Sequence, residues 1–300
     1  MKTTFTYHIG PADAGKKISL YLSEHGYSSR ILVRLRTTPD CVYIGETSVF
    51  SNRILEEGDV LTIHLTEKKG SESIVPVPME LDILFEDEHL MVINKPAGMP
   101  VHPSQGNYGN TLANGIAYYM EEKGIDFVFR AVNRLDRDTS GLLLIAKHML
   151  SSCILSDQVK DHAIHREYAA IVCGKTDDFG TVNVPIARKE GSTIERIPDV
   201  ENGESAITHY KTIAYDPALD LSYIRLLLET GRTHQIRVHM KHIGHPLPGD
   251  FLYHPDFRYI GRQALHSAYL KFTHPITGEC LEFHAPLPED MARLFCHRYS

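Results

Sequence analysis

The chain has 300 residues, 42% of them apolar and 23% charged, and its formal net charge is −7. This length and composition predict about two globular domains and exclude a disordered or fibrous chain. The longest apolar runs, such as 142–146, are far too short to cross a bilayer, and the first residues, MKTTFTYHIG, lack the apolar core of a secretory signal. We therefore expect a soluble cytoplasmic protein with no membrane partner.

The cysteine pattern points to the same compartment. The count is odd, and no two cysteines form a CxxC pair; they are Cys41, Cys153, Cys173, Cys280 and Cys296. A disulfide framework or a cysteine-rich zinc site is not expected from this pattern. Reduced thiols in the cytoplasm are the simplest interpretation.

The N-terminal part of the chain predicts a small α/β module. Helices are expected at 19–25 and 29–36, followed by strands at 41–44 and 60–65. Arg30, Arg34 and Arg36 lie on or near the second helix. This order resembles the S4-type RNA-binding module, and we assign it residues 1–75. The alternative is a small appendage whose helix turns a solvated charged face to water.

Charge supports this assignment only locally. Residues 1–53 carry seven Lys and Arg against four Asp and Glu, which gives +3 and leaves −10 for the rest of the chain. The net charge therefore argues against RNA binding unless the binding cleft is itself positive.

A polar segment at 66–80 predicts a linker, and a larger domain spans 76–300. Helices are expected at 112–122, with Thr111 as N-cap, at 149–159, and at 233–243 before Gly244. Strands are expected at 81–85, 90–94, 142–146, 168–173, 206–214, 222–229 and 268–273. Strands outnumber helices and do not alternate with them, which favours an α+β fold on a mixed, largely antiparallel sheet.

One polar turn stands out because it runs directly into the apolar strand at 142–146. Asp136 lies in this turn between Arg134 and Arg137. Nearby positive charge favours the ionised carboxylate, and a loop anchored by a buried strand is a good position for a nucleophile. The alternative is an ion-paired turn that only caps the sheet.

A second polar segment begins the helix expected at 233–243. Arg232 at its start would make an anion site, for a phosphate or for a partner carboxylate. Three histidines follow: His234, His239 and His242. A zinc-dependent hydrolase is a weak alternative because HExxH is absent and Arg237 and Lys241 add positive charge to the same helix. We expect these histidines to face solvent or RNA.

Two further segments are less informative. Tyr168, Ala170 and Val172 would share one face of a strand, so the tyrosine could stack on a flipped base or belong to the core. The loop at 94–103 contains Lys95 and several Pro and Gly residues, and it could form the wall of a pocket.

Together these segments resemble the RluA-type pseudouridine synthases. The family pattern consists of a Lys-Pro-x-Gly loop ending in His-Pro, Arg-Leu-Asp-x-x-Thr-Ser-Gly, Tyr-x-Ala-x-Val-x-Gly, Gly-Arg-Thr-His-Gln-Ile-Arg-Val-His, Leu-His and His-Pro-x-Thr-Gly. It is matched in order by 95–103, 134–141, 168–174, 231–239, 265–266 and 274–278. The agreement covers roughly residues 81–290. One departure is Asn133, where many members have histidine.

The resemblance implies roles for the matched residues. Asp136 would attack the target base or its ribose carbon. Tyr168 would stack on the base and assist removal of the C5 proton, and Arg232 would pair with Asp136. Arg134 would fill the gap left by the extruded base. Further contacts with RNA are expected from Arg137, Lys95, His102, His234, Arg237, Arg30, Arg34 and Arg36.

The resemblance also implies a substrate class and argues against a cofactor or a metal. Large-subunit ribosomal RNA is the expected partner, with transfer RNA as the alternative, and the protein is expected to act as a monomer. The isomerisation involves no redox step and no hydrolysis, so no cofactor and no metal are expected. A catalytically silent RNA-binding protein of the same fold is the second alternative.

Overall fold

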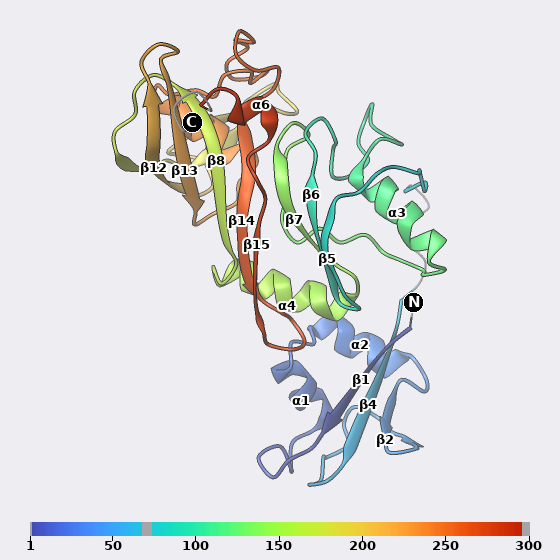
Figure 1. The fold of residues 1–300 in the computed structure, drawn as a ribbon. Helices are drawn as coiled ribbons and strands as arrows, with labels where there is room; N and C mark the ends of the chain where they lie inside the picture. The colour runs from blue at the N-terminus through green and yellow to red at the C-terminus, as the bar shows by residue number, and fades with distance from the viewer. Residues whose placement is uncertain (1, 68–73, 296–300) are drawn as a thin grey trace.

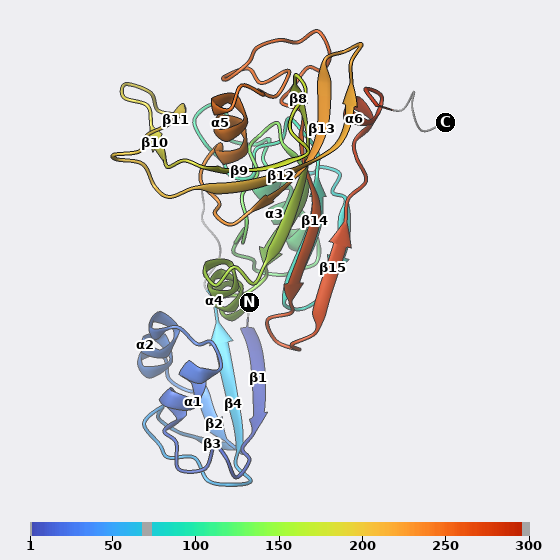
Figure 2. The same ribbon diagram turned by 90° about the vertical axis from the view of Figure 1, so that its left-hand side faces the viewer.

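The computed structural model describes residues 2–67 and 74–295. A small N-terminal module and a larger body are stacked end to end, with helix α4 (Met149–Lys160) at their junction (Figures 1 and 2). The predicted α+β class is confirmed, because each part contains its own sheet with helices packed on it.

The N-terminal module is a four-stranded antiparallel sheet in the order β1-β4-β2-β3 with two helices. Its elements are β1 (Lys2–His8), α1 (Ile18–Glu24), α2 (Ser29–Thr37), β2 (Val42–Ile44), β3 (Thr47–Ser48) and β4 (Val60–Thr66). Both predicted helices and both predicted strands are present. Strand β1 was not predicted; it pairs along its whole length with β4, from Lys2 opposite Thr66 to His8 opposite Val60.

The module is packed firmly against the larger body. Its apolar core includes Leu150 of α4, and Ile154 of the same helix lies against Gly26. Glu67 accepts a hydrogen bond from the Met149 backbone N–H (2.6 Å) and forms an ion pair with Arg130 (3.1 Å). These contacts fix the module relative to the body through α4.

The predicted linker at 66–80 lies partly outside the described residues, at 68–73. The part that follows is held on helix α3 (Leu112–Glu122). The Asn114 side chain donates to the Val75 carbonyl (2.7 Å), and Met79 lies where a side chain at Gly115 would be. Residues 74–81 therefore cover the helix rather than spanning open solvent.

The larger body is built on a nine-stranded sheet in the order β5-β6-β7-β14-β8-β13-β12-β9, with β15 also paired to β14. All neighbours are antiparallel except β7 and β14, which are parallel. The strands are β5 (Ile83–Glu86), β6 (Leu90–Lys95), β7 (Ser140–Ala146), β8 (His165–Cys173), β9 (Phe179–Asn183), β12 (Ile207–Asp216), β13 (Leu221–Leu228), β14 (Leu265–Thr273) and β15 (Cys280–His284). All seven predicted strands are present.

Short elements complete the body and were not predicted. They are the hairpin of β10 (Ile186–Arg188) and β11 (Arg196–Pro198), and helix α6 (Glu289–Ala292). Helix α5 (Gln235–His242) begins two residues later than predicted, because His234 adopts a left-handed conformation (φ 59°) at its N-cap. In the described part of the chain, no helix is long and apolar enough to cross a membrane.

Strand β7 lies in the middle of two apolar layers and is buried along its whole length. Leu143 and Ile145 belong to the core cluster that contains residues of α3, while Leu142 and Leu144 belong to the cluster on the opposite face. A strand covered on both faces reads as a continuous apolar run, which is why the sequence identified it.

Gly141 in β7 is required by the parallel contact with β14. Its φ is +107°, and a Cβ there would lie 2.2 Å from the Ser267 carbonyl oxygen. Only glycine permits this approach, so the Gly of the Thr-Ser-Gly motif sets the spacing of the two central strands.

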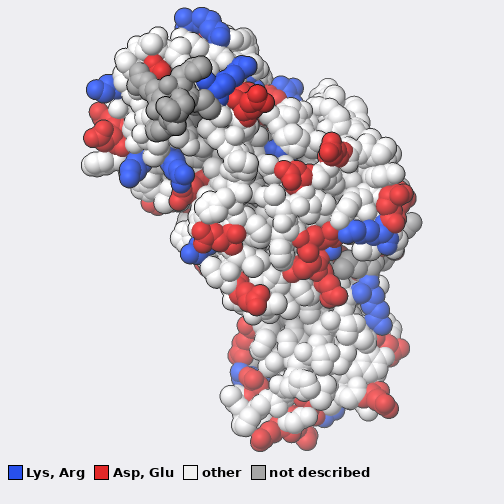
Figure 3. Space-filling model, viewed as in Figure 1, with Lys and Arg blue, Asp and Glu red and all other residues white. Residues whose placement is uncertain are grey.

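The space-filling view in Figure 3 shows acidic side chains in several groups over the larger body, with Lys and Arg scattered among them. The described part of this face therefore presents no continuous basic surface of the kind that binds nucleic acid. The described cysteines, Cys41, Cys153, Cys173 and Cys280, are free thiols, and Cys296 lies outside the described residues.

Candidate active site

A cleft of about 530 Å³ opens beside the central strands of the larger sheet. Most of its lining comes from three stretches far apart in sequence: the turn at 132–139, strand β8, and the segment 228–237 that leads into α5. The end of α4 and Leu265 complete it. Asp136, Tyr168 and Arg237 therefore face one cavity, although only the motif resemblance had linked them.

The turn that contains Asp136 is held from several sides. The Thr139 N–H donates to the Asp136 carbonyl (3.1 Å). Lys95 Nζ donates to the Arg137 carbonyl (3.0 Å), and Arg262 Nη1 donates to the Asp138 carbonyl (3.1 Å). With its backbone fixed, the turn presents the Asp136 side chain, 27% exposed, to the cleft.

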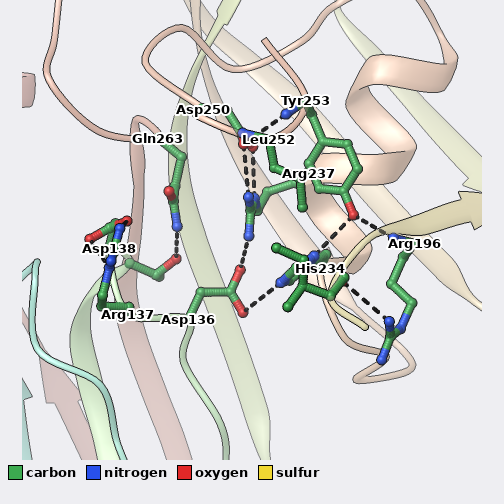
Figure 4. A network of polar contacts seen from close by, with 12 residues as sticks. Asp136, Arg137, Asp138, Arg196, His234, Arg237, Asp250, Leu252, Tyr253 and Gln263 are labelled. Atoms are coloured by element: carbon green, nitrogen blue, oxygen red, sulfur yellow. Dashed lines mark hydrogen bonds and ion pairs between the residues drawn. The ribbon is translucent and has the colours of Figure 1, made fainter. Parts of the chain in front are cut away.

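The cation on Asp136 is Arg237, not Arg232 as predicted. Arg237 Nη1 lies 2.7 Å from Asp136 Oδ2. Figure 4 shows the Arg237 guanidinium between two carboxylates, with its other edge on Asp250 through Nε (2.7 Å) and Nη2 (2.8 Å). Asp250 also accepts hydrogen bonds from the Leu252 and Tyr253 N–H groups (3.0 and 3.1 Å).

Arg232 points away because the turn before α5 is held by a glutamine. Gln235 Oε1 accepts from the Arg232 N–H (2.9 Å) and from the Thr230 hydroxyl (2.7 Å). The Arg232 guanidinium then reaches the Ser205 carbonyl (3.0 Å) and forms an exposed ion pair with Glu204. The predicted pairing of Arg232 with Asp136 is therefore wrong.

Arg237 and Asp250 form a nearly inaccessible pair, with side chains 2% and 1% exposed. Burial lowers the pKa of Arg237, but its hydrogen bonds and the charges of Asp250 and Asp136 outweigh this and raise the pKa above its ordinary value. The guanidinium also lies 4.9 Å from the centre of the Tyr253 ring. Such burial leaves Arg237 no surface for RNA, which corrects its predicted role.

Neither arginine of the turn itself pairs with Asp136. Arg137 is bound to the next residue, Asp138, through Nε (2.9 Å) and Nη2 (2.8 Å). Arg134 is exposed at the rim of the cleft. The positive charge that the sequence placed beside Asp136 is thus supplied by α5 instead.

Tyr168 forms part of the cleft wall and part of the core. It is 5% exposed and belongs to the apolar cluster on that face of the sheet. Burial raises the pKa of its phenol, the charge of Asp136 raises it further, and Arg166 acts against both. The hydroxyl is therefore protonated at neutral pH, and the residue belongs to the core while it also lines the cleft.

His234 lies on the other side of Asp136, with Nε2 3.9 Å from Oδ1 (Figure 4). Its Nδ1 is hydrogen-bonded to the Tyr253 hydroxyl (2.9 Å), which also accepts from the Arg196 N–H (2.9 Å). Burial lowers the pKa of His234, and the charge of Asp136 acts against this. A neutral imidazole beside the carboxylate is the expected state at pH 7.

His239 does not face solvent or RNA, contrary to expectation. It is fully buried and hydrogen-bonded to the Thr208 hydroxyl and the Val184 carbonyl, both at 2.9 Å. Among the residues that the structure describes, no group of three His, Cys, Asp or Glu side chains is placed to hold a metal ion.

Lys95 was predicted to contact RNA, but it is fully buried. Besides the Arg137 carbonyl, its Nζ donates to the carbonyls of Pro96 (2.7 Å) and Met99 (2.8 Å). Burial lowers its pKa to about 7, against the opposing charges of Asp138 and Asp136. Lys95 thus ties the Pro-Gly loop to the turn that contains Asp136, and it supports that turn instead of contacting RNA.

Two other predicted residues have clear positions. His102 is exposed and lies edge-on to the Phe129 ring, with 4.7 Å between ring centres. Asn133, the departure from the family pattern, is buried and ties the turn to β7: its side chain accepts from the Leu144 N–H (2.8 Å) and donates to the Leu142 carbonyl (3.2 Å).

Two partners of the site were missed by sequence reasoning. Asp250 and Tyr253 lie in a loop after α5 that no recognised motif covers. Arg237 was in a motif, but its partner Asp136 is 101 positions away. The motif at 231–239 contains two arginines, Arg232 and Arg237. Their spacing alone did not show which of the two turns toward Asp136.

Comparisons with known proteins place the residues of this cleft within a known enzyme family. The profile of the RNA pseudouridylate synthase family matches residues 89–242. The uncharacterized RNA pseudouridine synthase YjbO of Bacillus subtilis is 45% identical over 278 residues, which cover 91% of this chain and 96% of that protein. Ribosomal large subunit pseudouridine synthase D of Zymomonas mobilis is 46% identical, over 73% of each chain.

A solved structure shows the same fold. Human RNA pseudouridylate synthase domain containing 1 superposes with a TM-score of 0.58 at 25% identity, covering 73% of this chain and 86% of that one. The profile match spans the Asp136 turn, β8 and α5, which supply most of the lining of the cleft. The chain therefore belongs to the RluA-type family of RNA pseudouridine synthases, the isomerases that convert uridine in RNA to pseudouridine.

Proposed function

We propose that Asp136 is the carboxylate that attacks the target nucleoside, at the base or at the ribose carbon. The observation that carries this proposal is the arrangement around Asp136: a reachable carboxylate backed by the buried Arg237–Asp250 pair. Arg237 cannot itself reach RNA, so it acts by orienting Asp136 and by matching its charge. It replaces Arg232 in this role.

The reaction needs an extruded uridine, because its bonds are hidden in a stacked RNA. The glycosidic bond to N1 then breaks, the uracil rotates, and a carbon–carbon bond forms between the ribose and C5. C5 gives up one proton and the freed N1 takes one up, so the composition of the nucleoside is unchanged. Tyr168 lies in the same cleft as Asp136. Because its pKa is raised, we assign Tyr168 to stacking on the base rather than to removing the C5 proton.

Exposed basic residues around the cleft fit the RNA outside it. Arg134 at the rim is placed to fill the gap left by the extruded base. Arg134 also lines a second hollow next to the cleft, and three further arginines line that hollow: Arg188, Arg196 and Arg232. We assign this group to backbone phosphates, together with the exposed side chains of Arg137 and His102. Arg232 thus keeps a role in RNA binding.

The N-terminal module is proposed as a second RNA contact. Among the described residues, Arg30, Arg34 and Arg36 contact no acidic side chain at ion-pair distance, and Arg30 and Arg34 line a hollow that also includes Arg130 of the larger body. Unpaired arginines on one helix suit phosphate binding. The module would then anchor RNA at the junction with the body.

The proposed substrate is large-subunit ribosomal RNA, with transfer RNA as the alternative. Support comes from relatives in several bacteria that are named ribosomal large subunit pseudouridine synthase D, at 38–46% identity. Mapping pseudouridines in cellular RNA with and without this gene tests the substrate. Loss of a site in transfer RNA alone would overturn the ribosomal assignment.

The role of Asp136 is tested by Asp136→Asn and tritium release from RNA labelled at uridine C5. Release should fall by more than about 10³-fold, the scale of losing a nucleophile, while RNA binding persists. Asp138→Asn is the matched control, because it changes a carboxylate two residues away that pairs with Arg137. Normal release by Asp136→Asn would refute the assignment.

A further inference from the structure

Arg166 of β8 is a buried arginine with no anion of the protein beside it. Its residue is 8% exposed, and its Nε is inaccessible and has no hydrogen-bond partner. Within residues 2–67 and 74–295, no carboxylate lies at ion-pair distance from it. The other deeply placed arginines differ: Arg237 has Asp136 and Asp250, and Arg262 has Asp290.

The position of Arg166 directs its guanidinium to the cleft. It lines the same cavity as Asp136 and Tyr168, and Tyr168 follows two residues later on the same face of β8. A Cβ on Gly231 would lie 3.6 Å from Arg166 Nη1, so the glycine of the Gly-Arg-Thr-His motif keeps that edge of the guanidinium uncovered.

The nearby acids do not compensate this charge. Glu229 lines the cleft, but its carboxylate binds His209 Nε2 (2.6 Å). Asp136 is bound by Arg237. A buried cation without a partner is costly to retain, and it is an arrangement that an incoming anion would complete.

We propose that Arg166 binds a phosphodiester of the RNA backbone next to the extruded uridine. This inference rests on the proposed function, in which the cleft receives that uridine. Uracil is neutral, so the anionic part of the ligand in this cleft is the phosphate, and a guanidinium matches a phosphate with two parallel hydrogen bonds. The cleft continues from Arg166 to Lys160 and His162 at the end of α4, which gives the backbone a path out.

The experiment is a double-mutant cycle between Arg166 and single phosphates. The probe is a stem-loop RNA that contains the mapped uridine, with a neutral methylphosphonate at one flanking phosphate at a time. Binding is measured in the Asp136→Asn background, so that no turnover occurs. One methylphosphonate should weaken binding about 10- to 100-fold, as expected for a hydrogen bond to a charged group. Arg166→Met should weaken binding of the unsubstituted RNA by a similar factor. On the RNA that carries this methylphosphonate, Arg166→Met should cause no additional loss of affinity.

Arg225→Met is the matched control, because it removes an exposed arginine from the neighbouring strand β13. Its effect should simply add to that of either methylphosphonate. Additive behaviour of Arg166→Met at both positions, or unchanged affinity, would overturn the phosphate site. Failure of the wild-type enzyme to modify the unsubstituted RNA would instead overturn the proposed function.

A purely structural role for Arg166 is separated by stability without RNA. Because Arg166→Met removes an uncompensated buried charge, the midpoint of urea unfolding should stay the same or rise. A clearly lower midpoint, with rescue by Arg166→Lys, would show that Arg166 supports the sheet and would overturn the proposal.

Discussion

Replacing Arg237 by methionine should have a large effect on both stability and catalysis. Asp250, 1% exposed, would then be a buried carboxylate without its cation. Removing one partner of such a pair costs about 3–5 kcal/mol. Asp136 would lose the contact at 2.7 Å that orients it, and misplacement on the scale of 1 Å costs about 10²-fold in rate.

The comparison with Arg232→Met makes this prediction specific. The Arg232–Glu204 pair has side chains 40% and 70% exposed, and an exposed pair contributes less than about 1 kcal/mol. Urea unfolding gives the free energies, and tritium release at saturating RNA gives the rates. Arg232→Met should keep its stability and its rate at saturation.

A double variant separates the two losses caused by Arg237→Met. Adding Asp250→Leu removes the unpaired charge, so much of the stability should return. The rate should remain low, because Asp136 still lacks its partner. Recovery of the rate together with the stability in the double variant, or a rate for Arg232→Met as low as that of Arg237→Met, would show that Arg237 does not orient Asp136.

Three further predictions concern the rest of the chain. Burial lowers the pKa of His148 to about 3, so below pH 6.5 the unfolded chain binds a proton that the folded chain does not. The protein should therefore lose about 2 kcal/mol of stability through His148 between pH 7 and pH 5. The variant His148→Gln should not show this loss when its stability is measured by urea unfolding. Gly141→Ala should destabilise by about 2–5 kcal/mol in the same assay, through backbone overlap and its positive φ. Arg30→Glu with Arg34→Glu should reduce the salt dependence of RNA binding by about two ions.

Each of these has its own check. A pH profile of His148→Gln identical to the wild type would show that this imidazole does not titrate between the two states as argued. Gly98→Ala is the control for Gly141→Ala, since Gly98 has a similar positive φ but no atom within 4 Å of the added Cβ, and it should cost only about 1–2 kcal/mol. An unchanged salt dependence in the Arg30 and Arg34 variant would remove the N-terminal module from RNA binding.

Local patterns in the sequence predicted the elements whose partners are close along the chain or whose burial is complete. Helix α3 was placed at 112–122 with Thr111 as its cap, because a capping side chain and its target N–H are three residues apart. Strand β7 was evident from its continuous apolar run. Strand β1 was missed because its pairing partner, β4, is more than fifty residues away.

Sequence motifs were enough to identify the family, since the motif around Asp136 is contiguous and specific, and they singled out Asp136 as the proposed nucleophile. Which arginine serves that carboxylate was decided only by the tertiary structure. Gln235 holds the turn before α5, Arg232 leads outward to the Ser205 carbonyl, and Arg237 turns inward to Asp136. Asp250 holds the other edge of Arg237 from a loop without a motif. Spacing reports which residues share a helix, but the partner of a charged side chain depends on what the folded chain brings within about 3 Å of it.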